Sequence, residues 1–101
     1  MAYKVRILPT AWEDIKKIED WYAIQFETDT ALKVVHHILD VIERLEEYPG
    51  LGSLTPDTWL NDQGYRMVIC EKHVIIYRQI NKEVFVYHIA DTQTEYTKLF
   101  Y

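Results

Sequence analysis

Apolar and polar positions alternate along three runs in the last third of the chain, at 65–70, 73–80 and 83–90. Alternation with a period of two, in runs rich in Val, Ile, Tyr and Phe, is typical of β-strands. The pairs Glu71-Lys72 and Asn81-Lys82 alone separate one run from the next. Because a parallel crossover needs a dozen or more residues, such short connections permit only antiparallel hairpins. The pattern therefore predicts a three-stranded meander.

A further strand and a helix are predicted upstream of the meander. The strand is Tyr3–Leu8, where apolar and charged residues alternate until Pro9 ends the run. The helix is predicted to begin at Thr10, which has the spacing of a capping box with Glu13. Its apolar stripe follows a spacing of four, three and four residues and is flanked by two aromatic side chains: Ala11, Ile15, Ile18 and Tyr22, with Trp12 and Phe26 beside them.

A second helix is predicted from about Ala31 to Tyr48, where Pro49 and Gly50 stop it. Its apolar face is wider than that of the first helix, which indicates deeper burial. Only the polar break Glu27–Thr30 separates the two helices, so they are expected to form an antiparallel hairpin.

The predicted order is β-α-α-β-β-β-α, an α+β fold in one domain spanning residues 1–101. The meander and the N-terminal strand form an antiparallel sheet that packs against the helical hairpin. A short C-terminal helix, capped within 92–95, docks through Tyr96, Leu99 and Phe100. The segment Leu51–Gln63 lacks a clear period, and it is either a functional loop or a connector packed by Trp59.

Strand parity sorts the side chains of the meander into two faces. Each set of alternating residues is expected to share a face of its strand: Arg66, Val68 and Cys70; His73, Ile75, Tyr77 and Gln79; Val74, Ile76, Arg78 and Ile80; Val84, Val86 and His88; Phe85, Tyr87 and Ile89. Both faces are half apolar, so helices or a partner should cover both. Arg66 would then need an acidic partner or a cleft, and both a structural and a functional role remain open for it.

The charge balance points away from nucleic acid as a partner. The formal net charge is −5, and the eleven Lys and Arg residues are scattered along the chain, whereas phosphate binding usually needs a basic surface. A basic protein partner is favoured instead, and eight Tyr and three Trp residues suit an interface. Charged residues interrupt the N-terminal stretch, and no apolar run is long enough to cross a bilayer, so a cytoplasmic protein is expected.

Residues that could support enzymatic chemistry are few. There is no glycine-rich phosphate loop, no HExxH motif and no cysteine pair for zinc, and neither a metal nor a cofactor is expected. His36 and His37 are adjacent, so they do not share a helical face as paired ligands would. Cys70 is either a small buried apolar residue or a nucleophile activated by His73 across the hairpin turn.

In order and spacing the chain resembles the RelE/ParE superfamily of toxins from bacterial type II toxin–antitoxin, or plasmid stabilisation, modules. The matching features follow one another along nearly the whole chain: the strand YKVRIL; Pro9, Ala11, Asp14, Ile15, Ile18 and Tyr22; Ala31, Leu45, Pro49 and Gly52; the strand opening Gly64-Tyr65-Arg66; the hairpin HVIIYRQINKEVFVYHIA; and Glu95-Tyr96 with Leu99-Phe100.

The resemblance implies a toxin that is held inactive by a cognate antitoxin. In the RNA-cleaving branch, arginines are expected where this chain has Val74 and Thr94, and many members have histidine and arginine where it has Asp91 and Gln93. The first hypothesis is therefore a ParE-like, non-catalytic toxin whose implied target is DNA gyrase. The alternatives are a RelE-like, ribosome-dependent mRNA endonuclease and a degenerate toxin that only binds its antitoxin.

The meander carries the residues predicted to bind the target or the antitoxin, and the free protein is also expected to form a homodimer. These residues are polar or aromatic and lie on or just after the strands: Arg66, His73, Tyr77, Arg78, His88, Asp91 and Tyr96. If the chain is a ribonuclease, Arg66, His88 and Tyr96 would act on the phosphate, since cleavage through the 2′-hydroxyl needs a base, an acid and a cation.

Overall fold

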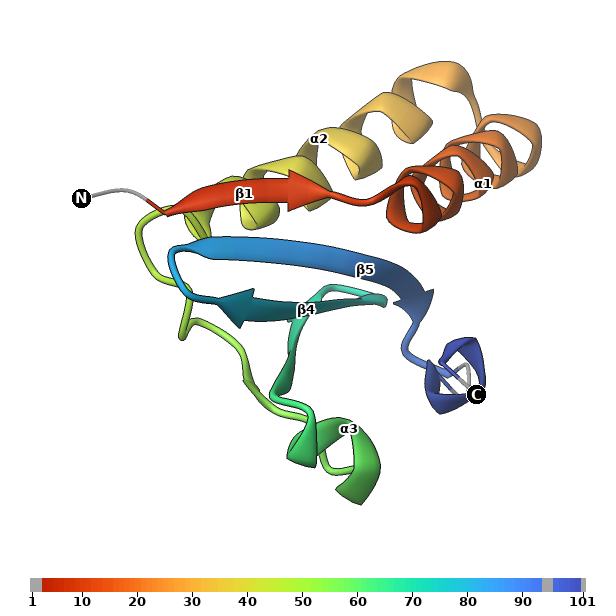
Figure 1. Ribbon diagram of the computed structural model, residues 1–101. Coiled ribbons are helices and arrows are strands. Elements are labelled where there is room, and N and C mark those ends of the chain that lie inside the picture. Colours follow the sequence, from red (N-terminus) through yellow and green to blue (C-terminus); the bar gives the residue numbers. More distant parts are fainter. Residues whose placement is uncertain (1–2, 94–95, 101) are drawn as a thin grey trace.

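A computed structural model describes residues 3–93 and 96–100 and confirms the α+β fold (Figure 1). The elements in chain order are β1 (Lys4–Ile7), α1 (Pro9–Gln25), α2 (Thr28–Arg44), β2 (Ser53–Leu54), α3 (Thr58–Asp62), β3 (Tyr65–Cys70), β4 (His73–Ile80), β5 (Glu83–Asp91) and the 3₁₀ helix η1 (Tyr96–Leu99). The predicted order is present, with β2 and α3 added inside the segment that showed no period. The proposed cap within 92–95 falls partly outside the described residues. Within them, no helix is long and apolar enough to cross a membrane.

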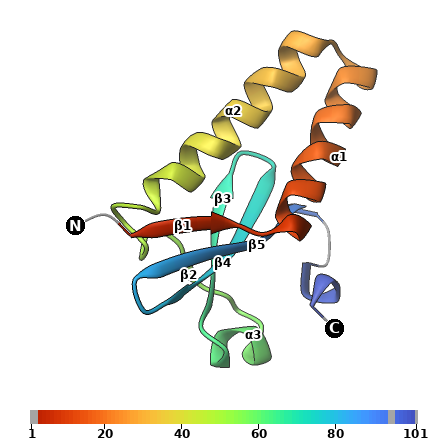
Figure 2. The same ribbon diagram turned by 45° about the horizontal axis from the view of Figure 1, so that its top comes forward.

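The sheet has the order β1-β5-β4-β3-β2, with the meander antiparallel as predicted. β1 is the exception, because it pairs with β5 in parallel and makes the sheet mixed rather than antiparallel. No tight turn links β1 to β5. The helical hairpin and the rest of the meander lie between the two strands in sequence, so their relative direction is not restricted to antiparallel. Figure 2 shows both helices on one side of the sheet.

A β-bulge in β5 changes the predicted faces of the last strand. Ile76 lies opposite His88, but Tyr77 lies opposite Val86, so Tyr87 is an extra residue. The prediction that Val86 and His88 share a face is therefore wrong, because a bulge reverses the alternation beyond it.

Two cores result, one on each face of the sheet. The first core packs between the sheet and the helical hairpin and includes Ile15, Ile38, Leu45, Ile75, Tyr77, Val84, Val86 and Ile89. The second core lies on the other face and comprises Leu60, Tyr65, Val74 and Ile76, with Met67, Tyr87, Tyr96 and Phe100 packed against them. Both faces are covered, as the sequence predicted. In the segment 51–63 the buried anchor is Leu60, whereas Trp59 is 47% exposed.

Helix α1 begins at Pro9 with Leu8 as its N-cap, so the capping box at Thr10 is not formed. The Thr10 hydroxyl instead donates to the carbonyl of Tyr87 at 2.6 Å, and Asp14 Oδ2 accepts the N–H of Ile89 at 3.0 Å. Strand β1 pairs with β5 only as far as Val86. Two side chains of α1 thus supply hydrogen-bond partners for the edge of β5 that β1 leaves unpaired.

Tyr77 fastens the turn after α2 to the central strand. Its buried hydroxyl donates to the carbonyl of Pro49 and accepts the N–H of Gly52, both at 2.8 Å. Arg66 Nη1 donates to the carbonyl of Gly52 at 2.7 Å. A Cβ at Gly52 would lie 2.5 Å from the carbonyl oxygen of Met67, so only glycine fits there. Burial raises the pKa of Tyr77, although the Gly52 hydrogen bond and Arg66 oppose the shift.

Replacing Tyr77 by Phe should lower the free energy of unfolding by about 2–4 kcal/mol, because it leaves two buried backbone groups without their partner. Urea denaturation followed by circular dichroism measures the change. The matched control is Tyr48→Phe, since Tyr48 is 68% exposed, and it should change stability by less than about 0.5 kcal/mol. Equal effects of the two variants would contradict a stabilising role for the Tyr77 hydroxyl.

Cys70 and His73 are opposite one another at the β3–β4 turn, and both are buried. Burial, with Glu71 adding to it, raises the pKa of the Cys70 thiol, which is the reverse of what an activated nucleophile needs. Burial lowers the pKa of His73, although Asp91 and Glu71 oppose the shift. The surroundings therefore favour the small, buried cysteine over the nucleophile.

The lowered pKa of His73 predicts a loss of stability in acid. The unfolded chain takes up a proton on this histidine below about pH 6.5, while the folded chain resists protonation. The contribution is therefore present above pH 6.5 and lost as the pH falls toward the lower folded pKa. Urea midpoints between about pH 5 and 7.5 should fall less steeply for His73→Gln than for the unchanged chain. Parallel curves would refute the prediction.

Candidate functional site

We call the face of the sheet that carries the second core the second face. Arg78 lies on this face, in contact with two tyrosine rings. Its guanidinium carbon is 4.8 Å from the centre of the Tyr65 ring and 5.4 Å from that of Tyr87. Nη2 donates to the Tyr87 hydroxyl at 2.8 Å, and Nη1 donates to the carbonyl of Gln63 at 3.4 Å. Among the described residues, Nε is buried without a hydrogen-bond partner. Burial raises the pKa of Tyr65, partly offset by the charge of Arg78.

The last described residues complete this surface. The Phe100 ring packs edge-on against Tyr65 at 4.9 Å and against His88 at 5.3 Å. Tyr96 also contacts the second core, and burial, with Asp57 adding to it, raises the pKa of its hydroxyl. Of the predicted binding residues, Arg78, His88 and Tyr96 thus gather around the aromatic rings of the second face.

His88 is held by Asp14 of α1, at the edge of β5. Its Nδ1 lies 2.8 Å from Asp14 Oδ2, and both side chains are mostly buried. Because a carboxylate oxygen only accepts, Nδ1 is the donor, and the other ring nitrogen, Nε2, can act as an acceptor in the neutral ring. Asp14 was absent from the predicted site residues. The resemblance included it, but nothing in the strand pattern links a residue of the first helix to the last strand.

Arg66 and His88 lie on opposite faces of the sheet. Arg66 pairs with Tyr77 of the first face and is bound to Gly52 through a backbone carbonyl. His88 pairs with Ile76 of the second face. No carboxylate of the described residues forms an ion pair with Arg66, and its polar partner is the backbone carbonyl of Gly52 rather than the acid that the sequence suggested. The sheet therefore separates two of the three residues that a ribonuclease centre would use.

The remaining predicted residues lie elsewhere. Tyr77 is fully buried, and its hydroxyl is hydrogen-bonded to the Pro49–Gly52 turn. No ligand can reach it in this fold. His73 and the exposed Asp91 line a groove of about 490 Å³ between α1 and the ends of the strands. Asp91 Oδ1 also accepts the N–H of Gln93 at 2.8 Å.

Other positions named from the sequence add no catalytic groups. Val74, where an arginine was expected in the RNA-cleaving branch, is buried in the second core, and Thr94 lies outside the described residues. Within residues 3–93 and 96–100, no three His, Cys, Asp or Glu side chains are placed to bind a metal ion. His37 Nδ1 instead lies 3.3 Å from Glu71 Oε1 at the β3–β4 turn.

Solved structures share this fold. The chain is similar to a chain of the chromosomal ParDE toxin–antitoxin system from P. aeruginosa, with a TM-score of 0.76 and 22% sequence identity over 89% of this chain and 96% of that one. It is also similar to a chain of the toxin–antitoxin complex RelBE2 from Mycobacterium tuberculosis, with a TM-score of 0.68 and 16% identity over 90% and 99%. At these identities the likeness establishes the fold.

The sequence itself establishes the family. No curated protein matches the chain. The profile of the family described as the ParE toxin of the type II toxin–antitoxin system parDE matches residues 5–96, from β1 to the start of η1. The chain therefore belongs to the ParE toxin family of type II toxin–antitoxin systems.

Proposed function

We propose that this ParE-family toxin arrests growth by binding DNA gyrase without cleaving any substrate, and that a cognate antitoxin neutralises it in the bacterial cytoplasm. The observation that supports a binding mechanism is the placement of Arg66 and His88 on opposite faces of the sheet. Phosphoryl chemistry needs base, acid and cation around one phosphate, within hydrogen-bond reach. The net charge of −5 also disfavours an RNA substrate.

The second face is the contact surface we propose for the target. Arg78, Tyr96 and Phe100 meet there around the rings of Tyr65 and Tyr87. Arginine and tyrosine dominate the binding energy of many protein interfaces, because they combine a large apolar contact with a directed polar group. Arg78 is the cation we propose for this contact, because its guanidinium lies against both tyrosine rings.

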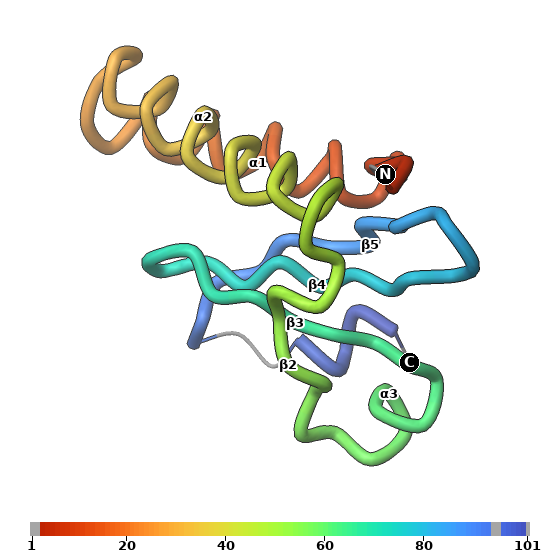
Figure 3. The backbone as a smooth tube through the Cα atoms, turned by 90° about the vertical axis from the view of Figure 1, so that its left-hand side faces the viewer, coloured from red at the N-terminus to blue at the C-terminus, as the bar shows by residue number. Residues whose placement is uncertain are grey.

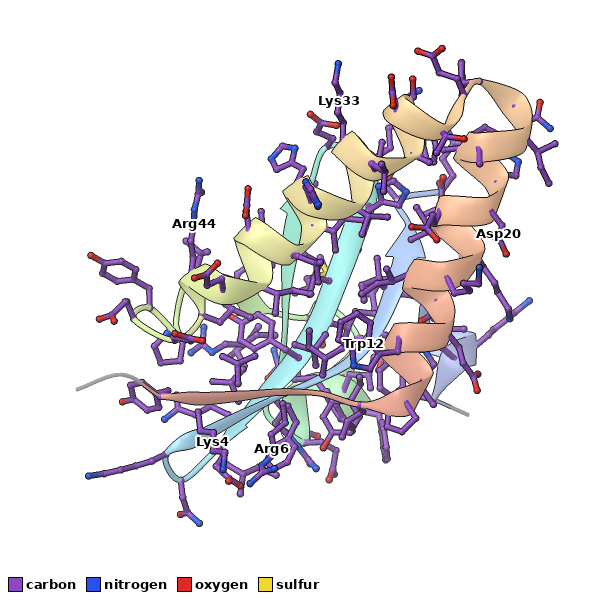
Figure 4. The ribbon with its side chains drawn as sticks, turned by 90° about the horizontal axis from the view of Figure 1, so that it is seen from above. Lys4, Arg6, Trp12, Asp20, Lys33 and Arg44 are labelled. Atoms are coloured by element: carbon purple, nitrogen blue, oxygen red, sulfur yellow. The ribbon has the colours of Figure 1, made fainter. Side chains whose placement is uncertain are left out.

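The proposed target is tested by gyrase supercoiling in the presence of the purified protein at micromolar concentration. The unchanged protein should inhibit the reaction. Arg78→Glu should weaken inhibition by about tenfold or more, because a charge reversal at a central contact costs at least about 1.4 kcal/mol. The control is Lys33→Glu, the same charge change on exposed α2, where Lys33 points away from the sheet (Figure 4). Circular dichroism verifies that both variants are folded.

Lack of inhibition by the unchanged protein would contradict gyrase as the target. If the protein also fails to arrest growth on expression but still binds the antitoxin encoded beside its gene, the degenerate toxin is the better account. Co-purification of that neighbouring product with the tagged toxin tests the antitoxin partner separately.

One observation favours the alternative, an mRNA endonuclease. The hydrogen bond from His88 Nδ1 to Asp14 leaves Nε2 as the ring nitrogen that could accept a proton, as a general base must. Mapping of mRNA ends after incubation with translating ribosomes tests this alternative. We expect no cuts above background. Cuts in the ribosomal A site that disappear with His88→Ala would establish the endonuclease and refute a purely binding mechanism.

A further inference from the structure

The groove of about 490 Å³ between α1, the β3–β4 turn and the end of β5 has an aromatic wall. Helix α1 and its C-cap supply this wall, which consists of Trp21, Tyr22 and Phe26. The Trp21 and Tyr22 rings meet edge-on at 4.9 Å, and Tyr22 stacks on Phe26 at 5.8 Å, so the wall is formed before any ligand enters. A cavity of this volume lined by aromatic side chains is typical of a small-molecule site.

His73 lines the same groove from the start of β4. It is only 6% exposed, and no described residue forms a hydrogen bond with its ring nitrogens. Among the described side chains, the unpartnered nitrogen that is sealed from solvent is Arg78 Nε, so the His73 nitrogens remain reachable from the groove. Burial lowers the pKa of His73, and the neutral ring donates through one N–H. Because buried polar groups nearly always have a partner, this unpartnered ring points to a ligand.

Two lysines without ion pairs line the groove as well. Lys17 comes from α1 and Lys72 from the β3–β4 turn, and both are exposed. The preceding Lys16 forms ion pairs within α1, whereas no carboxylate of the described residues pairs with Lys17 or Lys72. Of the described lining residues only Asp91 is acidic, and its Oδ1 already accepts the N–H of Gln93. In a chain of net charge −5, the groove thus has a local excess of positive charge, which attracts an anion.

These groups together select the chemistry of the ligand. A carboxylate only accepts hydrogen bonds, and its contacts with ammonium groups are charge-assisted. A planar ring packs well, edge-on or offset, against aromatic side chains. We propose that the groove binds a small aromatic carboxylate of one or two rings, whose ring lies against the aromatic wall and whose carboxylate is bound by Lys17, Lys72 and His73.

The site is separate from the contact surface proposed for the target. His73 lies on the face of β4 that carries Tyr77, whereas Arg78 lies on the second face. Binding of the carboxylate therefore does not depend on whether gyrase is the target, and each proposal can fail without the other.

NMR titration of the ¹⁵N-labelled protein tests the site, with indole-3-acetate as the ligand and neutral indole-3-acetamide as its matched control. The chain has three tryptophan indole N–H groups. Indole-3-acetate should shift the signal of Trp21 and leave those of Trp12 and Trp59, which do not line the groove, in place. We expect a dissociation constant on the order of 0.1 mM, as for a ligand of this size. The amide should bind about tenfold more weakly, because it lacks the charge.

Variants separate the charge contact from the ring contact. Lys17→Gln and Lys72→Gln should each weaken binding of the acid about threefold to tenfold and leave the amide unchanged, since only the acid carries the partner charge. His73→Phe keeps a ring but removes the donor, and should weaken the acid about threefold or more. Trp21→Ala should weaken both compounds about tenfold, because the wall serves both. Lys33→Gln, on exposed α2, is the matched control and should change neither.

The same spectra verify that each variant is folded. Absence of a Trp21 shift with indole-3-acetate at up to about 5 mM would overturn the proposal, as would equal affinity for the acid and the amide. Loss of acid binding with Lys33→Gln as large as with Lys17→Gln would show a general charge effect and would also overturn it.

Discussion

Strand β4 is buried on both faces from His73 to Tyr77, and the fold depends on the contacts that these residues make on each face. Tyr77 points into the first core, where its hydroxyl holds the Pro49–Gly52 turn, and Ile76 points into the second. A central strand without a wet face must be covered from both sides. The helical hairpin provides one cover, and α3 with η1 provides the other, as the tube in Figure 3 shows. Loss of the Tyr77 hydrogen bonds would free the Pro49–Gly52 turn, which connects the helical hairpin to the segment that contains α3.

This requirement determines what the polar residues of the meander can do. Tyr77 and Arg66 both bind the backbone of Gly52. The side chains of Thr10 and Asp14 bind the unpaired edge of β5. Asp14 also positions His88. Side chains that look reactive in the sequence are thus engaged in maintaining the sheet. Surfaces remain for binding: the aromatic second face around Arg78, and the groove beside α1. A toxin that acts by occupying a larger protein needs such surfaces rather than a set of proton-transfer groups.

The meander, the helical hairpin and the fold class could be predicted because each depends on local periodicity and short connections. The bulge at Tyr87 could not, since one extra residue in a strand leaves no sign in the alternation until the partner strand is known. Because Tyr87 is extra, His88 lies opposite Ile76 and not on the face that Arg66 shares with Tyr77. The parallel pairing of β1 and the contact from Asp14 to His88 are long-range facts of the same kind. At Thr10 the local sequence has the spacing of a helix cap, but the side chain donates a tertiary hydrogen bond to the carbonyl of Tyr87 instead.

Growth arrest by the variant His88→Asn tests the central claim most directly, namely that binding and not catalysis carries the toxicity. The asparagine amide can donate to Asp14 as Nδ1 does, which preserves the edge of the sheet, but it offers no ring nitrogen to accept a proton. Expressed to equal soluble levels without an antitoxin, the variant and the unchanged chain should arrest growth equally. A folded His88→Asn protein that leaves growth unaffected, beside an unchanged chain that arrests it, would contradict the account.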